Sequence, residues 1–313
     1  MTLTIYALGS NSGGQLAQGN MEDVHYLRAT QFLSADTDDD SQHLRVHGGG
    51  NHAFAWTATT LLGCGSTADG ELPVVEETES AEKRRPILCW TPVATPYPEC
   101  RVQQVACGWN HTLLLDDTGT VYAAGSGAFG QLGGGGGVPR AAALDKWTRV
   151  AVTAAAAPEA RRVVGVACGM RHSLALDSSG SVFGWGANRS GQLGILPGSN
   201  VLTPTLVSKD LPPIAMIACG RSHSILVASD RRTVFVAGQD KYAQHGPATA
   251  TTTRPSHGSC WHSFRLPRAA VKLCSGWDFG AVLLEPSSTS AGNVVVWGRA
   301  DQGQMACTVE DGG

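Results

Sequence analysis

The stretch that decides the fold reads Val166-Ala-Cys-Gly-Met-Arg-His-Ser-Leu-Ala-Leu176. It combines a short apolar strand, a Cys-Gly turn and a second apolar strand that starts at a histidine. Further copies of this pattern span residues 46–56, 105–115, 217–227 and 273–283, and the last copy has Phe279 in place of the histidine. Internal repetition of this kind predicts one structural unit used several times.

A second motif follows each copy and consists of an apolar strand, a glycine and then Gly-Gln-Leu or a variant. The strand glycines are Gly9, Gly65, Gly125, Gly186, Gly238 and Gly298, which lie 52 to 61 residues apart. That period suits one four-stranded blade of a β-propeller. We therefore predict an all-β chain with a single β-propeller over residues 1–313. Six repeats are visible, and seven blades remain an alternative if one repeat is too degenerate to recognise.

Two polar turns are expected to close hairpins inside the blades. They are Asp116-Asp-Thr-Gly119 and Asp177-Ser-Ser-Gly180. Glycine adopts positive φ without a steric penalty, so the fourth residue of each turn can reverse the chain.

The repeat resembles that of the regulator of chromosome condensation family. The resemblance rests on Cys-Gly-x-x-His-Ser/Thr-Leu, a turn, and Val-x-x-Trp-Gly-x-Asn-x-x-Gly-Gln-Leu-Gly. Residues 163–194 match this pattern most closely, and the similarity extends from about residue 3 to residue 306. The resemblance implies a propeller that usually has seven blades.

Composition limits the classes of partner. The formal net charge is −3, and no strong basic cluster is present, so direct nucleic-acid binding is not expected. No apolar run approaches the length of a membrane-spanning helix, and the first residues do not resemble a secretory signal. We expect a cytoplasmic protein, with entry into the nucleus left open.

The nine cysteines are odd in number and include no Cys-x-x-Cys pair, which indicates free thiols and no zinc ribbon. Neither a metal nor a cofactor is expected. Asp36, Asp38, Asp39 and Asp40 lie close together, but their loop lacks the spacing of an EF-hand.

Three motifs with catalytic associations are better explained by the repeat. Gly125-Ser-Gly-Ala-Phe-Gly130 fits the dinucleotide fingerprint, but the glycines from Gly133 onward would not begin a helix. Ser222 beside His223 lacks any sign of an oxyanion hole. The repeated histidines, including His52, His111, His172 and His223, occupy one position in different blades. We expect each to tie two strands of its own blade by a hydrogen bond, so the chain is predicted not to be an enzyme.

The two residues after each motif glycine vary while the framework around them does not. Strict repetition places these loops on one face, and Trp, Met and Arg are enriched at protein interfaces. An alternative for Trp109 and Trp277 is that they cover the edge of a neighbouring blade. The candidate partner-binding residues are Trp109, Asn110, Met170, Arg171, Arg221, Trp277 and Asp278.

Within the family, the chain resembles the fungal alpha-tubulin suppressor branch, also called killer-toxin-insensitivity propellers. That resemblance implies a non-catalytic adaptor in a heterodimer with a small zinc-binding protein of the diphthamide pathway. It also implies support for Elongator-dependent wobble-uridine modification of tRNA and for diphthamide synthesis on elongation factor two. Two alternatives stay open: a guanine nucleotide exchange factor for a small GTPase, and another tubulin- or ubiquitin-linked scaffold.

Overall fold

The computed structural model describes residues 4–32, 44–73, 85–135, 143–152, 161–246, 259–287 and 293–301. The named elements in these ranges are all β-strands, β1 to β21. The chain divides into two compact units, residues 1–151 and 152–313. The single domain over residues 1–313 stays a prediction.

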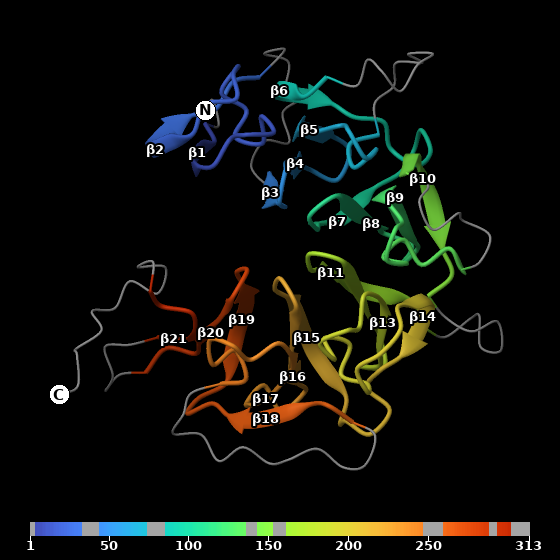
Figure 1. Cartoon of the computed structure of the whole chain (residues 1–313), viewed down its shortest axis with the longest axis vertical. Coiled ribbons are helices and arrows are strands. Elements are labelled where there is room, and N and C mark those ends of the chain that lie inside the picture. The colour runs from blue at the N-terminus through green and yellow to red at the C-terminus, as the bar shows by residue number, and fades with distance from the viewer. Residues whose placement is uncertain are drawn as a thin grey trace. The chain divides into compact units, whose positions relative to one another are not determined.

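Unit 1 contains three antiparallel sheets in chain order (Figure 1). The first pairs only two strands, and the other two have four each. The strands are β1 Tyr6–Gly9 and β2 Val24–Ala29; β3 Arg45–Gly48, β4 His52–Trp56, β5 Leu61–Gly65 and β6 Ile87–Pro92; β7 Val102–Cys107, β8 His111–Asp116, β9 Val121–Ser126 and β10 Ala143–Val150.

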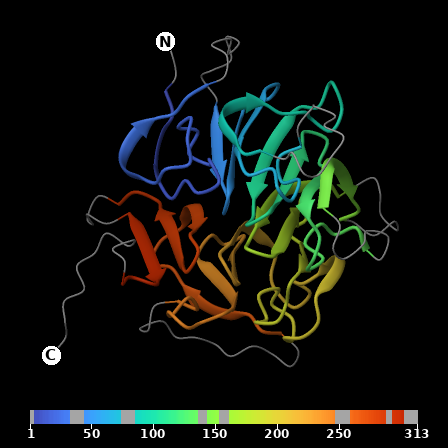
Figure 2. The same ribbon diagram turned by 45° about the horizontal axis from the view of Figure 1, so that its top comes forward.

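Unit 2 also contains three antiparallel sheets, which follow one another in chain order in both ribbon views (Figures 1 and 2). Two sheets have four strands and the last has three. The strands are β11 Val163–Cys168, β12 His172–Asp177, β13 Val182–Gly186 and β14 Val201–Leu206; β15 Ile214–Cys219, β16 His223–Ala228, β17 Thr233–Gly238 and β18 His262–Arg265; β19 Ala270–Ser275, β20 Phe279–Leu284 and β21 Val294–Gly298.

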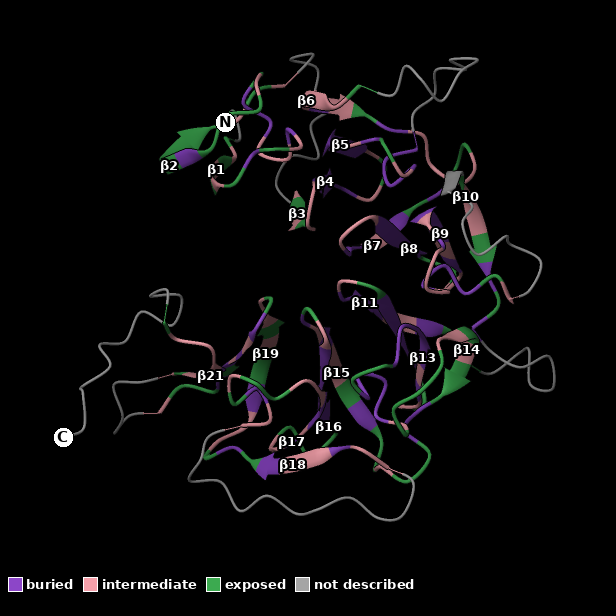
Figure 3. Cartoon of the chain, in the orientation of Figure 1, coloured by how far each residue is buried: buried purple, intermediate pink, exposed green. Residues whose placement is uncertain are grey.

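The predicted all-β propeller fold with four-stranded blades is confirmed, but the number of blades is corrected. Five sheets begin with the first-half motif and have three or four strands, so the described residues contain five blades. The β1–β2 sheet contains only the second half of a repeat, which is why it has two strands. It buries little: β2 is exposed from His25 to Ala29 (Figure 3).

No helix in the described part of the chain has the length and hydropathy needed to cross a membrane.

The strands near the middle of each blade are apolar on both faces because both faces are covered. Every residue of β16 is buried. Its Leu226 packs with Leu174 and Leu193 of the preceding blade, whereas its Ile225 and Val227 pack in a cluster with residues of the following blade. Alternate side chains of one strand therefore enter two different interblade cores, since successive residues point to opposite faces of a sheet.

The predicted hairpin turns are confirmed, and a buried aspartate organises each of them. Oδ1 of Asp116 accepts from the backbone nitrogens of Thr118 and Thr120 at 3.0 and 2.8 Å. Oδ1 of Asp177 does the same for the two serines at the equivalent positions, both at 2.9 Å. The turn glycines, Gly119 and Gly180, have φ values of 85° and 84°.

The strand glycine of each repeat is required by both conformation and space. All six of these glycines have φ between 101° and 117°, a region that residues with a side chain rarely adopt. At Gly186, a Cβ atom would lie 2.6 Å from the carbonyl oxygen of Arg171 and 2.7 Å from the Cα of His172. Replacement by any other residue would force β12 and β13 apart.

The repeated histidines bond to the neighbouring blade, so the prediction of a bond within one blade is wrong. Nε2 of His52 lies 2.8 Å from Oγ1 of Thr112, and Nε2 of His172 lies 3.0 Å from Oγ of Ser224. Both hydroxyl groups belong to the next blade. The single-sequence pattern could not show this, because the histidine and its partner are 60 and 52 residues apart in the two cases.

The direction of these hydrogen bonds follows from a third group. Oγ1 of Thr112 donates to the carbonyl of Glu71 at 2.8 Å, and Oγ of Ser224 donates to the carbonyl of Gln192 at 2.6 Å. A hydroxyl group has one proton, so the histidine must donate from Nε2. In both cases, the hydroxyl group of the next blade links two motifs of one blade. It accepts from the histidine of the first motif and donates to a backbone carbonyl of the Gly-Gln-Leu motif.

Burial keeps His52 and His223 neutral. It is the main cause that lowers the pKa of His52 to about 3, with a smaller contribution from the nearby His47. It is also the main cause that lowers the pKa of His223 to about 4, a shift to which His245 contributes and which Asp240 opposes. A neutral imidazole with its proton on Nε2 is the form that the interblade hydrogen bond needs.

We predict that removing one interblade hydroxyl destabilises the fold. Ser224→Ala should lower the free energy of unfolding by about 1–3 kcal/mol, because it leaves a buried N–H and a buried carbonyl without their partner. Urea denaturation measures the change. The control is Ser178→Ala, the same substitution at an exposed position, which should change stability by less than about 0.5 kcal/mol. Equal effects of the two variants would contradict this role.

We predict that stability falls on acidification through the buried histidines. The folded-state pKa values of His52 and His223 lie below the unfolded value of about 6.5, so the unfolded chain binds more protons below that pH. Stability is complete above the unfolded pKa and is lost as the pH falls toward the folded values. Urea denaturation at about pH 7.5 and about pH 5 should differ by about 2 kcal/mol for each histidine.

The control for this pH dependence comes from the chain itself. His223→Phe copies the residue that the last blade has at this position, Phe279, and removes one titrating group. A pH slope that stays as steep in this variant as in the native chain would show that His223 does not contribute.

Candidate functional site

The candidate site consists of the loops that follow each motif glycine and join the first two strands of a blade. Each of the five blades has the same backbone hydrogen bond at this loop. The nitrogen of the residue after the strand glycine donates to the carbonyl of the second variable residue. The five bonds are Ser66 to Asn51, Ser126 to Asn110, Ala187 to Arg171, Gln239 to Ser222 and Arg299 to Asp278, at 2.8–2.9 Å. The framework therefore holds the backbone, and the side chains are free to differ.

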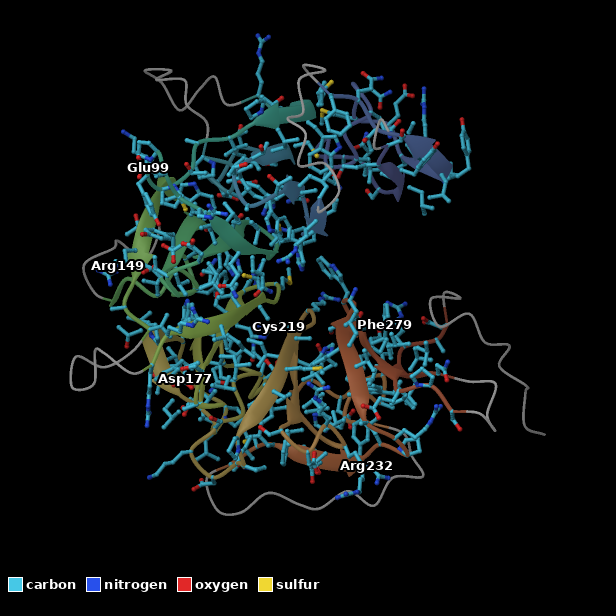
Figure 4. The ribbon with its side chains drawn as sticks, turned by 180° about the vertical axis from the view of Figure 1, so that it is seen from behind. Glu99, Arg149, Asp177, Cys219, Arg232 and Phe279 are labelled. Atoms are coloured by element: carbon cyan, nitrogen blue, oxygen red, sulfur yellow. The ribbon has the colours of Figure 1, made fainter. Side chains whose placement is uncertain are left out.

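In unit 2, three of these loops are joined edge to edge. The backbone nitrogen of Met170 donates to the carbonyl of Arg221 at 3.3 Å, and that of Arg221 donates to the carbonyl of Trp277 at 2.7 Å. Figure 4 labels Cys219 and Phe279 at the ends of strands that flank two of the loops, in neighbouring blades. The structure thus brings together three predicted residues that the sequence separates by more than 50 positions.

The side chains of these loops form an aromatic and basic surface. The guanidinium carbon of Arg221 lies 5.9 Å from the centroid of the Trp277 ring, within reach of a cation–π interaction. Trp277 is 42% exposed, and Arg171 and Arg221 are exposed as well. We call Met170, Arg171, Arg221 and Trp277 the Arg221–Trp277 surface.

Arg221 has positive charge to offer a partner. Among the described residues, no carboxylate forms an ion pair with it. A guanidinium that stacks on an aromatic ring keeps its N–H edge available for a carboxylate or phosphate.

Asp278 is buried, unlike Arg171, Arg221 and Trp277, and its Oδ2 lies 3.8 Å from Nη1 of Arg299. Partner binding by Asp278 stays a prediction. Arg299 also bonds to both carboxylate oxygens of Asp301, and its guanidinium lies 4.8 Å from the ring centroid of Tyr242. Lys241 lies 5.2 Å from the same ring.

These neighbours were not among the predicted site residues. Arg299 directly follows the strand glycine Gly298, and Tyr242 lies just before the Gln244 of a degenerate repeat. Their positions in the repeat could have identified them, because both differ from copy to copy and lie next to residues that recur in the motif.

In unit 1, the predicted residues serve the neighbouring blade. A Cβ atom on Gly50 would lie 2.4 Å from Cε3 of Trp109, so the indole ring rests directly on the Gly50 backbone. The backbone nitrogen of Gly50 donates to the carbonyl of Gly108 at 2.9 Å. Nδ2 of Asn110 donates to Oδ2 of Asp69 at 3.0 Å. These contacts agree with the alternative that Trp109 covers a blade edge, and partner binding by Trp109 and Asn110 stays a prediction.

The motifs with catalytic associations take part in the repeat framework. Nε2 of His223 lies 3.3 Å from Oγ of Ser275 in the next blade, which occupies the position of the cysteine in other copies. After β9, the fingerprint-like segment turns through the bonds Gly130 to Gly127 and Gly133 to Gly130. The Asp36–Asp40 segment lies outside the described residues.

The cysteines are small framework residues. Eight of the nine lie in the described ranges, and all eight are free thiols, as predicted. Burial raises the pKa of the Cys219 thiol to about 12, which holds it in the unreactive protonated form. Within the described ranges, no group of three or more His, Cys, Asp or Glu side chains is arranged to hold a metal ion.

Comparison with known proteins places this geometry in a family. The family model of the RCC1-like domain matches residues 3–312. The secretion-regulating guanine nucleotide exchange factor of Bos taurus is 32% identical over 316 residues, which cover 98% of this chain and 62% of the relative. The protein of the same name from Mus musculus is 32% identical over 317 residues, with the same coverage. The chain thus spans less than two thirds of these relatives.

Solved structures support the fold. Human WBSCR16 superposes with a TM-score of 0.71 at 21% identity, covering 94% of this chain and 73% of that protein. Prp20p from Saccharomyces cerevisiae superposes with a TM-score of 0.64 at 17% identity, covering 91% of this chain and 79% of that protein.

These relatives correct one prediction and leave another without support. Guanine nucleotide exchange factors act catalytically on GTPases, so the prediction that the chain is not an enzyme is overturned by the two mammalian relatives. The narrower resemblance to the fungal tubulin-suppressor branch is not supported by these comparisons. The broader resemblance is confirmed, because the match extends over nearly the whole sequence. The chain belongs to the RCC1-like domain family of β-propellers.

Proposed function

We propose that this chain is a guanine nucleotide exchange factor for a small GTPase and that it contacts the GTPase through the Arg221–Trp277 surface. The observation that carries the proposal is the 32% identity to two mammalian exchange factors over 98% of the chain. The chain spans 62% of those relatives, so exchange activity is a proposal for this chain.

Nucleotide exchange is a reaction that a surface can catalyse. The exchange factor must bind the nucleotide-free GTPase more tightly than the GDP-bound form, and this difference in affinity lowers the barrier to GDP release. The reaction makes and breaks no covalent bond. It requires a rigid, well-positioned contact surface, which the backbone hydrogen bonds between the three loops supply.

The chemistry of the Arg221–Trp277 surface suits this task. Trp and Arg are the residue types that contribute most binding energy at interfaces, especially near the centre of a patch. Arg221 lacks an ion pair among the described residues, so a carboxylate of the GTPase can complete its coordination without displacing an internal partner. Met170 and Trp277 add apolar area on either side of it.

The adaptor interpretation loses its support. A heterodimer with a small zinc-binding protein of the diphthamide pathway, and a link to Elongator, rested on the fungal branch alone, and no comparison favours that branch. The exchange assay below separates the two functions, because an adaptor would not accelerate GDP release.

The expected result of an exchange assay is faster GDP release from at least one member of a panel of purified small GTPases. The release of a fluorescent GDP analogue should accelerate at least about tenfold, equivalent to about 1.4 kcal/mol of barrier lowering. Each GTPase must first release its nucleotide when EDTA removes the magnesium ion, as a positive control. A full panel that responds to EDTA but not to this chain would rule out the proposed activity toward those GTPases.

Substitutions in the Arg221–Trp277 surface should weaken exchange on the responsive GTPase. Trp277→Ala and Arg221→Ala should each reduce the apparent affinity by about 2 kcal/mol, or roughly 30-fold, if they lie at the centre of the interface. The matched control is Leu202→Ala, which removes an apolar side chain of similar exposure, 43%, from β14. Exchange that survives both surface substitutions unchanged would place the contact elsewhere on the molecule.

A further inference from the structure

One turn of the fifth repeat departs from all other copies in three coordinated ways. It lies between β17 and β18, at residues 238–246. Ala243 replaces the glycine of Gly-Gln-Leu, and His245 replaces the leucine. Asp240 stands two residues after the strand glycine, where the first and fourth copies have Asn11 and Asn188 and no other copy has a carboxylate.

The alanine makes this turn strained. Ala243 has φ of 58°, whereas the glycines at its position, Gly14, Gly70, Gly130 and Gly191, have φ of 72–84°. A residue with a Cβ atom loses about 1–2 kcal/mol in the left-handed region. This turn therefore carries a local strain that the four glycine turns lack.

His245 makes contacts within this turn that a leucine side chain does not make. Its Nε2 lies 2.9 Å from the carbonyl oxygen of Gly238, and its Nδ1 lies 3.3 Å from Oδ2 of Asp240. Its backbone nitrogen donates to Oδ1 of Asp240 at 2.8 Å. In the fourth repeat, the nitrogen of Leu193 donates to Oδ1 of Asn188 in the same way, at 3.2 Å. Asp240 thus keeps the framework bond with one oxygen and offers the second oxygen to the imidazole ring.

The two ring nitrogens of His245 lie beside groups that have no proton to donate: Nε2 beside a carbonyl oxygen, and Nδ1 within ion-pair distance of a carboxylate. The imidazolium form carries a proton on both nitrogens and is attracted to both groups. The neutral form with its proton on Nε2 keeps the bond to Gly238 and loses the ion pair with Asp240. The described turns of this kind in the other repeats have leucine at this position, so the dependence on protonation is specific to the fifth repeat.

Other titratable groups near the ring act in both directions. The ring of His262 on β18 stacks on that of His245, with centroids 4.1 Å apart and planes 22° apart. His223 on β16 stays neutral, since burial lowers its pKa to about 4 and the charge of His245 adds to the shift. Asp240 is the one carboxylate that these contacts bring to the ring.

We propose that protonation of His245 closes a pH-dependent clamp, from Gly238 to Asp240, that orders the strained turn 238–246. The turn carries Lys241 and Tyr242, whose ring lies under Arg299. The carbonyl of Gln244 in the same turn accepts from Nε1 of Trp297 at 2.8 Å. The clamp therefore acts on a surface segment beside Asp278 and Arg299, and it does not depend on the exchange activity proposed above.

Hydrogen–deuterium exchange of the full chain at about pH 6 and about pH 7.5 tests the clamp, since histidine changes charge in this interval. After correction for the intrinsic effect of pH, amides of residues 238–246 should be about two- to fivefold more protected at the lower pH, as expected for one partly exposed ion pair. The internal control is the equivalent turn, residues 186–194, which has Leu193 and should show no such change.

Two variants separate the clamp from general effects of pH. His245→Leu restores the residue of the other repeats and should abolish the pH dependence of residues 238–246. Asp240→Asn keeps the framework bond to the backbone, as Asn188 does, and should abolish it without altering the ring. The buried histidines destabilise the whole chain at low pH, which acts in the opposite direction and cannot imitate the clamp.

Protection that is independent of pH in the native chain would overturn the proposal. The same would follow if Asp240→Asn kept the native pH dependence. Should His245→Leu fail to fold, the Asp240→Asn comparison and the ring nitrogen shifts of His245 by NMR still decide the question. Two protonated ring nitrogens at about pH 6 support the clamp, and a neutral ring at that pH contradicts it.

Discussion

The interblade hydrogen bond from histidine through a Ser or Thr hydroxyl to a backbone carbonyl is the constraint on which the blades depend. It connects the two halves of one repeat to the start of the next repeat, with each atom buried. Its partners are matched: the hydroxyl group has one proton, which goes to the carbonyl, so the imidazole must be neutral and protonated on Nε2. Burial meets that requirement by holding the pKa of His52 and His223 far below the usual range.

Degenerate repeats show how this constraint is kept when its residues change. In the last blade, Phe279 replaces the histidine and Gly280 replaces the following Ser or Thr. The hydroxyl group that His223 needs then comes from Ser275, which stands at the position of the cysteine. In the fifth repeat, the loss of a glycine at Ala243 is accompanied by the His245–Asp240 pair. In both cases, different side chains provide the hydrogen-bond partners that the repeat needs.

The loops after the motif glycines are the places where the framework leaves the side chains free to differ. The same backbone bond fixes the second variable residue in five blades, so evolution can change the side chains there without loosening the strands. Unit 2 uses this freedom to gather Met170, Arg221 and Trp277 into one exposed surface, whereas unit 1 uses Trp109 to cover Gly50. Residues of the same type at the same motif position therefore do different things in different blades.

The sequence by itself determined the strands, the aspartate turns, the positive-φ glycines and the family. All of these depend on local chemistry: alternation of side chains across a strand, the freedom of glycine, and an aspartate that accepts from the amides of its own turn. Only the tertiary structure decided the partners of His52, His172 and His223, the number of blades, the burial of Asp278 and the exposure of Trp277 in contrast to Trp109. These properties depend on which residue of the neighbouring blade faces each position. That residue lies 50 to 60 places away in the sequence, beyond the reach of any local pattern.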